Sequence, residues 1–206
     1  MGPNGAGKTT VFNAICGLVR RSAGSITVDG QPIGSSPSRL RKLGVARTLQ
    51  GLGLFDGLTV AENVLVPLWS LTAESRERAD RQLAGLGLAD LASADVAVLP
   101  YPQRKQVALA RALVTGPRLL LLDEPAGGLG AADIAAFADV VRDIADRGCA
   151  VLLVEHHVDF VMGVADHVVV LDFGRVIAAG SPDQIRTDPL VEEAYLGVRA
   201  DEAEAS

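Results

Sequence analysis

The chain has 206 residues, 49% hydrophobic and 21% charged, so it can bury one core of its own beneath a charged surface. Its 19 basic and 25 acidic side chains leave a net charge of −6, which disfavours binding to nucleic-acid phosphates through bulk charge. The longest apolar runs are strand-sized, far below the roughly 20 residues of a membrane span. No secretory signal is visible, and two cysteines are too few for a disulfide framework, which indicates a reducing cytosol.

Short runs of β-branched residues or leucine, each bounded by Gly, Pro or Asp, predict the strands of a sheet. They span residues 25–29, 44–50, 119–123, 150–154 and 167–172. The runs at 119–123 and 150–154 are continuously apolar, which is typical of parallel strands covered by helices on both faces.

The segment between these two strands, residues 131–147, predicts an amphipathic helix that ends at Gly148. Apolar side chains fall on one face of it at spacings of three and four: Ile134, Phe137, Val141 and Ile144. A strand, helix, strand order predicts an open α/β sheet with its ligand site at the carboxyl ends of the strands.

Residues 51–112 differ from the rest, because strand patterns give way to helices with caps at Thr59 and Thr72. We expect one domain over residues 1–199, with a core made of 1–50 and 113–199 and a helical insertion at 51–112. The small acidic residues at 200–206 cannot bury apolar surface, so we expect a disordered tail.

Residues 2–9 read Gly-Pro-Asn-Gly-Ala-Gly-Lys-Thr and fit the phosphate-loop pattern G-x-x-x-x-G-K-[ST], with a helix expected at 9–18. Glycines let successive backbone N–H groups face phosphate oxygens, and the helix start adds a positive dipole. Lys8 is expected to reach the β and γ phosphates, and Thr9 to offer its hydroxyl to Mg²⁺. The alternative is an ordinary glycine-rich turn before a helix.

Asp123 and Glu124 follow a buried strand, where an open sheet binds its ligands. Asp123 is expected to hold magnesium. Because neighbouring strand residues point to opposite faces, Glu124 is better placed to polarise the water that attacks the γ-phosphate. The alternative is a pair of solvated acids before a proline turn.

Together these motifs resemble the ABC transporter ATP-binding subunits over nearly the whole chain. Residues 2–9 resemble the family's Walker A, residues 119–124 its Walker B with the catalytic glutamate, Gln50 its Q-loop and His156 its switch histidine. The resemblance implies a P-loop NTPase fold, with a mainly parallel sheet and a helical insertion. Residues 44–50, 58–64 and 194–197 look like the branched-chain amino-acid importer type.

The resemblance implies an ATP-hydrolysing subunit, peripheral on the cytoplasmic face of the membrane, that uses ATP and Mg²⁺. Its implied partners are permease subunits, a second ATP-binding subunit (itself or a paralogue) paired head to tail, and indirectly an extracytoplasmic solute-binding protein. The implied catalytic residues are Glu124 and His156, and the implied metal site is Thr9, Gln50 and Asp123. The implied ATP-binding residues are Asn4, Gly5, Ala6, Gly7, Lys8, Thr9, Thr10 and Gln50.

The segment that resembles the family signature departs from its pattern. It reads Leu99, Pro100, Tyr101, Pro102 and Gln103, with proline in place of the second glycine. Pro102 has no backbone N–H, so a donor that the family aims at the partner's γ-phosphate is missing. Gly130 stands where the family has Asp or Asn, and His157 where it usually has Asp; we interpret His157 as a surface residue.

Met1 stands where the family has the end of a buried strand, so we expect an N-terminal antiparallel subdomain to be truncated or its start codon to lie upstream. Three functions remain open. The first is an active importer ATPase for branched-chain or related amino acids. The second is a partner subunit that completes a neighbour's ATP site without hydrolysing efficiently. The third, a DNA-repair ATPase, is disfavoured because no long heptad region is present.

Overall fold

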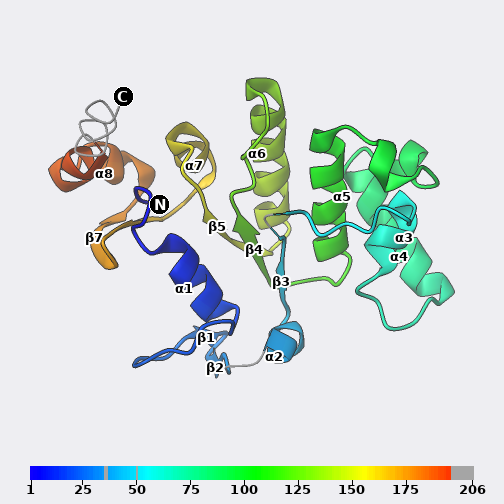
Figure 1. Cartoon of the computed structure of the whole chain (residues 1–206), viewed down its shortest axis with the longest axis horizontal. Helices are drawn as coiled ribbons and strands as arrows, with labels where there is room; N and C mark the ends of the chain where they lie inside the picture. Colours follow the sequence, from blue (N-terminus) through cyan, green and yellow to red (C-terminus); the bar gives the residue numbers. More distant parts are fainter. Residues whose placement is uncertain (35–36, 50, 196–206) are drawn as a thin grey trace.

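A computed structural model describes residues 1–34, 37–49 and 51–195 (Figure 1). Its centre is a parallel sheet of β3 (Val45–Arg47), β4 (Leu119–Asp123) and β5 (Ala150–Val154). β4 lies in the middle, and its five residues pair in register with the five of β5. The predicted α/β class with parallel strands is confirmed. Gln50 and the expected tail at 200–206 lie outside the described residues.

Two antiparallel hairpins accompany this sheet. β1 (Thr27–Val28) pairs with β2 (Gln31–Pro32), and β6 (Val168–Asp172) pairs with β7 (Arg175–Gly180). The strands predicted at 25–29 and 44–50 are too long, and β7 was not predicted. The β-branched residues of β7 are confined to Val176 and Ile177, and small residues follow them, so its pairing with β6 defines it instead.

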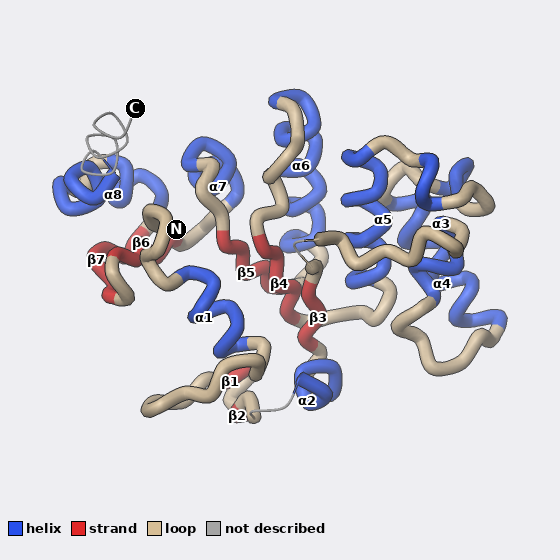
Figure 2. Tube along the Cα trace, in the orientation of Figure 1, coloured by secondary structure: helices blue, strands red, loops and turns tan. Residues whose placement is uncertain are grey.

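Helices surround the strands (Figure 2). Those with described bounds outside residues 51–112 include α1 (Lys8–Ile15), α2 (Pro37–Lys42), α6 (Ala131–Asp146), α7 (Val158–Val164) and α8 (Pro182–Arg186). The helix predicted at 9–18 is wrong at its end, because the turn after Cys16 leads into Gly17 with a φ of 68°. The helix predicted at 131–147 is confirmed, and Gly148 follows it with a φ of 88°.

Helices make up the regular structure described in residues 51–112 and lie together on one side of the sheet (Figure 1). They are α3 (Val60–Leu65), α4 (Ala73–Gly85) and α5 (Tyr101–Leu113), with 3-10 turns at Ala89–Leu91 and Val96–Val98. Both predicted caps are confirmed: Thr59 forms a capping box with Glu62, and Thr72 accepts from the Ser75 amide.

The apolar core joins β4 to helices on both of its faces. Leu120 and Leu122 pack in a cluster with Phe137 of α6, whereas Leu121 packs with Phe12 of α1. β5 is less covered than predicted, since Ala150 and Leu152 are exposed. Alternate residues of a strand point to opposite faces, and α1 covers only part of the face opposite α6.

Trp69, in the loop after α3, lies over the side of α2. The Arg41 guanidinium is 5.2 Å from the centre of its indole ring, and the indole is otherwise 89% exposed. This contact joins the helices of residues 51–112 to α2, which packs beside β3.

None of the helices in the described part of the chain has the length and apolar character required to span a membrane.

Candidate functional site

The predicted phosphate loop lies against the β6–β7 hairpin. The Gly174 amide donates to the Ala6 carbonyl over 3.0 Å, and the Leu171 amide donates to the Met1 carbonyl over 2.8 Å. A Cβ on Gly2 would lie 2.1 Å from the Leu171 carbonyl oxygen, so only glycine fits there. The hairpin thus holds the loop from behind, while Asn4, Gly5, Thr9 and Thr10 remain exposed.

Lys8 begins α1 and is 9% exposed. Its Nζ donates to the carbonyls of Gly2 and Pro3, over 2.7 and 2.8 Å. Burial lowers the pKa of Lys8, and the negative charge of Glu124 opposes that change. Both of these acceptors are neutral carbonyl oxygens of the phosphate loop itself. A phosphate group would give the buried Lys8 ammonium an anionic acceptor, and hydrogen bonds between charged groups are stronger.

Asp123 is the last residue of β4, at the carboxyl end of the central strand. Burial raises its pKa, as do the nearby charges of Glu124 and Glu155, whereas Arg47 opposes the rise. Carboxylates that repel one another at a half-buried position favour a bound cation. The hydroxyl of Thr9 and the Asp123 carboxylate are oxygen donors of the kind that Mg²⁺ prefers, so the residues fit that ion.

Glu124 does not occupy the strand position that was predicted for it. β4 ends at Asp123, and Glu124 follows in a turn with a left-handed φ of 47°, in which the Gly127 amide donates to the Glu124 carbonyl. The backbone at Glu124 therefore turns instead of continuing the strand, so the alternation of strand residues does not apply to it. Such a conformation costs a non-glycine residue on the order of 1–3 kcal/mol and persists only where surrounding contacts hold it.

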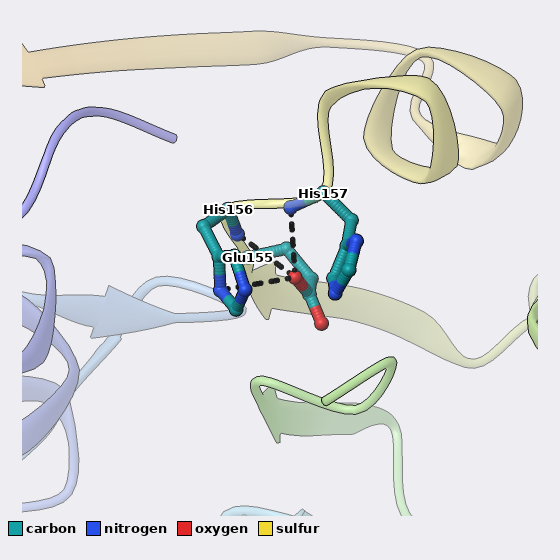
Figure 3. A group of neighbouring side chains, drawn as sticks. All are labelled: Glu155, His156 and His157. Atoms are coloured by element: carbon teal, nitrogen blue, oxygen red, sulfur yellow. Dashed lines mark hydrogen bonds and ion pairs between the residues drawn. The ribbon is translucent and has the colours of Figure 1, made fainter. Parts of the chain in front are cut away.

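His156 lies in the turn after β5, beside a buried carboxylate (Figure 3). Glu155 is fully buried, and its Oε2 accepts the amides of His156 and His157 over 2.8 and 3.1 Å. Its Oε1 accepts the Ala126 amide over 2.7 Å. The side chain of His156 is half exposed, with Nδ1 3.6 Å from Glu155 Oε2. His156 therefore has a fixed backbone and an accessible ring.

Glu155, His156 and His157 also form a group whose possible metal-binding atoms lie within 4.8 Å of one another. The ring centres of the two histidines are 4.5 Å apart, and His157, which was expected at the surface, is partly exposed. The three backbone N–H bonds to Glu155 account for its burial, so the carboxylate needs no ion to satisfy it.

The segment predicted as the signature begins α5 and lies on the turn that follows β4. The Tyr101 ring lies so close to Gly128 that a Cβ there would be 2.9 Å from the ring. Leu99 is buried, and Pro102 occupies the first turn of α5, where a helix leaves its amides without internal partners. Proline therefore preserves the helix and removes only a donor that could have pointed outward.

The sequence interpretation missed two cations of α5 that hold neighbouring loops. Lys105 Nζ donates to the carbonyls of Pro125 and Gly127, and lies 3.5 Å from that of Glu124. Arg111 donates to the carbonyls of Leu52 and Gly53, just after Gln50. Both cations lie among apolar residues of an amphipathic helix, and that pattern is the signal that could have identified them.

The predicted site residues that the structure describes thus gather near the carboxyl ends of β4 and β5. The negative charge of Glu124 lies close enough to Lys8 to raise the pKa of that lysine, Asp123 pairs with Val154 in the sheet, and His156 follows two residues later. The signature segment reaches the same turn through Tyr101. The family model described as an ABC transporter matches residues 1–127, more than half of this chain. The chain belongs to the ABC transporter family.

A second family model, described as a branched-chain amino acid ATP-binding cassette transporter, matches residues 175–201. The predicted family is thereby confirmed, and this protein is an ATP-binding cassette of the transport-ATPase kind.

Curated relatives span most of the chain. BraF of Pseudomonas aeruginosa, a high-affinity branched-chain amino acid transport ATP-binding protein, is 36% identical, and the match covers 96% of this chain and 85% of BraF. LivG of Escherichia coli, described in the same words, is 35% identical with the same coverage. LptB of Acidithiobacillus ferridurans, a lipopolysaccharide export system ATP-binding protein, is 37% identical, and the match covers 96% of this chain and 83% of LptB.

Solved structures agree with this family. The ADP conformation of an ATP-binding cassette of an ABC transporter aligns with a TM-score of 0.86 and 29% identity, over 96% of this chain and 86% of that one. A nucleotide-free cassette from an ABC transporter aligns with a TM-score of 0.84 and 29% identity, over 94% and 85%. The cassette fold and its capacity for nucleotide follow from these similarities.

Proposed function

We propose that the protein binds and hydrolyses ATP to power an importer of branched-chain or related amino acids. The observation that carries this proposal is the convergence of a buried phosphate-loop lysine, Lys8, with Asp123 and Glu124 at the end of β4. The match to the branched-chain amino acid cassette over residues 175–201 and the similarity to BraF and LivG support the substrate class.

The exposed phosphate loop is the proposed binding site for the ATP phosphates. Backbone amides of residues 4–10 would donate to the phosphate oxygens, and Lys8 would exchange its two carbonyl partners for the β and γ phosphates. Thr9 and Asp123, with Gln50, are the proposed ligands of Mg²⁺, which would supply charge neutralisation at the phosphates.

Glu124 and His156 are the proposed catalytic residues. Glu124 would accept a proton from the attacking water, and its turn keeps it separate from the metal-binding Asp123. The half-exposed ring of His156 would donate to the γ-phosphate. These roles need the two turns after β4 and β5 to hold a fixed distance from each other.

The proposed partners are a second ATP-binding subunit, paired head to tail, and permease subunits that receive solute from an extracytoplasmic binding protein. This assembly would place the protein at the cytoplasmic face of a membrane. The signature segment of each subunit, here Leu99, Pro100, Tyr101, Pro102 and Gln103, would complete the ATP site of the other.

Pro102 favours a second candidate function. It is a partner subunit that contributes to a neighbour's ATP site without hydrolysing ATP efficiently, and Pro102, which lacks a backbone N–H, is a departure of that kind. Loss of one charge-assisted hydrogen bond is worth roughly 1.5–3 kcal/mol.

The test is equilibrium binding and turnover of Mg-ATP by the purified chain and two variants. Glu124→Gln is expected to lower turnover by roughly 10²–10⁴-fold, the size of a general-base contribution, and to leave ATP affinity intact. Lys8→Ala is expected to abolish binding, because it removes the cation of the loop.

Unchanged turnover in Glu124→Gln would remove this residue from the reaction. Binding without turnover in the wild-type chain, alone and with its partner subunit, would favour the second candidate function. Uptake of radiolabelled leucine by cells that carry or lack the gene tests the substrate class.

A further inference from the structure

One peptide group in the turn after β4 lies between two buried charges. The Pro125 carbonyl accepts from Lys105 Nζ over 2.6 Å, and the Ala126 amide of the same peptide donates to Glu155 Oε1 over 2.7 Å. Lys105 is 8% exposed and Glu155 is not exposed at all. The cation thus lies at the oxygen end of the peptide dipole and the anion at its N–H end.

This arrangement is electrostatically favourable at both ends. The C=O and N–H of a trans peptide point in opposite directions, so the cation and the anion each meet the partial charge of opposite sign. Hydrogen bonds to charged groups are stronger than neutral ones, and bonds linked in a chain polarise one another. The two charges are therefore coupled through the Pro125–Ala126 peptide.

The same two side chains reach the other parts of the candidate site. Glu155 also accepts the amides of His156 and His157, and Lys105 also binds the Gly127 carbonyl. The strained backbone of Glu124 directly precedes this peptide. The turns that carry Glu124 and His156 are consequently joined by one carboxylate, and the turn that carries Glu124 is joined to α5 by one ammonium group.

We propose that Lys105 and Glu155 are positioning residues that clamp the Pro125–Ala126 peptide and thereby fix Glu124 relative to His156. The proposal rests on the proposed function for its effect on hydrolysis, whereas the clamp itself is a property of the protein without nucleotide. Because α5 begins at the signature segment, the clamp also connects the segment expected to face a partner's ATP with the subunit's own catalytic turn.

The first measurement is the NMR exchange rate and chemical shift of the Ala126 amide in the full chain without nucleotide. Glu155→Gln removes the charged acceptor and is expected to raise the exchange rate by about 10-fold to 100-fold, the loss of a charge-assisted hydrogen bond. Lys105→Met, which touches only the carbonyl side, is expected to move the same amide resonance upfield and to raise its exchange rate by a smaller factor.

Arg104→Met is the matched control, because the neighbouring Arg104 binds Asp56 instead of the turn. Lys105→Arg keeps the positive charge and is expected to leave the exchange rate and chemical shift of the Ala126 amide as in the wild type. An Ala126 amide that stays unchanged in Lys105→Met, or that moves equally in Arg104→Met, overturns the proposal. Should Lys105→Met not fold, the same measurement on Lys105→Gln, with its uncharged donor, decides.

The second measurement is turnover and ATP affinity of the same variants. Lys105→Met is expected to lower kcat on the order of 10-fold to 100-fold, as for a misplaced catalytic group, with the ATP Kd unchanged and with recovery in Lys105→Arg. An equal loss of kcat and of ATP affinity contradicts a positioning role. A wild-type chain that does not hydrolyse ATP refutes the proposed function, and the amide measurement still decides on the clamp.

Discussion

At the scale of single residues, the site keeps like charges close together. Asp123 lies near Glu124 and Glu155, and burial adds to the rise of its pKa. Lys8 could be predicted as a site residue, because the phosphate-loop pattern consists of residues that are adjacent in the sequence. The contacts of Lys105 with Pro125 and of Glu155 with Ala126 could not be predicted, because they join residues 20 and 29 positions apart that meet only after folding.

Asp123→Asn is expected to stabilise the nucleotide-free protein at pH 7 while it abolishes Mg²⁺-dependent turnover. A raised pKa means that the folded state holds this proton more tightly than the unfolded chain, so the contribution of Asp123 to stability falls as the pH rises from about 4. After allowance for solvent screening, the gain from the substitution is up to about 1 kcal/mol.

Urea unfolding of wild type and Asp123→Asn between pH 4 and 8 checks this expectation, with Asp90→Asn at an exposed position as control. The difference between wild type and variant should grow with pH. A variant less stable than wild type at every pH would show that the Asp123 charge is satisfied in the folded protein.

At the scale of elements, local patterns predicted what local forces determine. The caps at Thr59 and Thr72 and the end of α6 at Gly148 were predicted correctly, because each depends on residues within one turn. β7 was not predicted, and β5 was wrongly predicted to be covered on both faces. Both features depend on which segments pack beside the strand, and the pattern of apolar residues does not contain that information. Asn63 is fully buried; its side chain accepts from the Phe55 amide and donates to the Phe55 carbonyl. No sequence pattern predicted this contact.

Thr59→Ala is expected to lower the free energy of unfolding by about 1 kcal/mol, the usual effect of losing an N-cap. The Thr59 hydroxyl accepts the Glu62 amide, and the Glu62 carboxylate accepts the Thr59 amide over 2.8 Å, so the substitution leaves the box half made. Urea unfolding measures the change.

Thr59→Ser keeps the oxygen and serves as the control for the cap. Equal losses in Thr59→Ala and Thr59→Ser would show that the threonine methyl group, and not the capping bond, provides the stability.

At the scale of the whole molecule, α5 connects two loops. Its first turn contacts Gly128 and its Lys105 binds Pro125, both in the turn after β4, whereas Arg111 holds the loop at Leu52 and Gly53. A displacement of the start of α5 would therefore reach both the turn after β4 and the loop at Leu52 and Gly53.

Pro102→Gly is expected to raise ATP turnover only in the presence of a partner subunit, because the restored amide would face the partner's ATP. The isolated chain should instead lose up to about 1 kcal/mol of stability, since glycine has more freedom in the unfolded state. Turnover measured with and without the partner, beside unfolding of the isolated variant, separates these effects. Higher turnover in the isolated chain would contradict the head-to-tail arrangement.

The contact between Arg41 and Trp69 has a spectroscopic consequence. Trp69 is the single tryptophan of the sequence, its indole is 89% exposed, and the cation beside it belongs to α2. Emission from an indole depends on the charges and solvent around it, so separation of α2 from the loop after α3 would change the fluorescence of the protein. Trp69 is therefore a built-in optical reporter of movement between α2 and the loop after α3, without an attached dye.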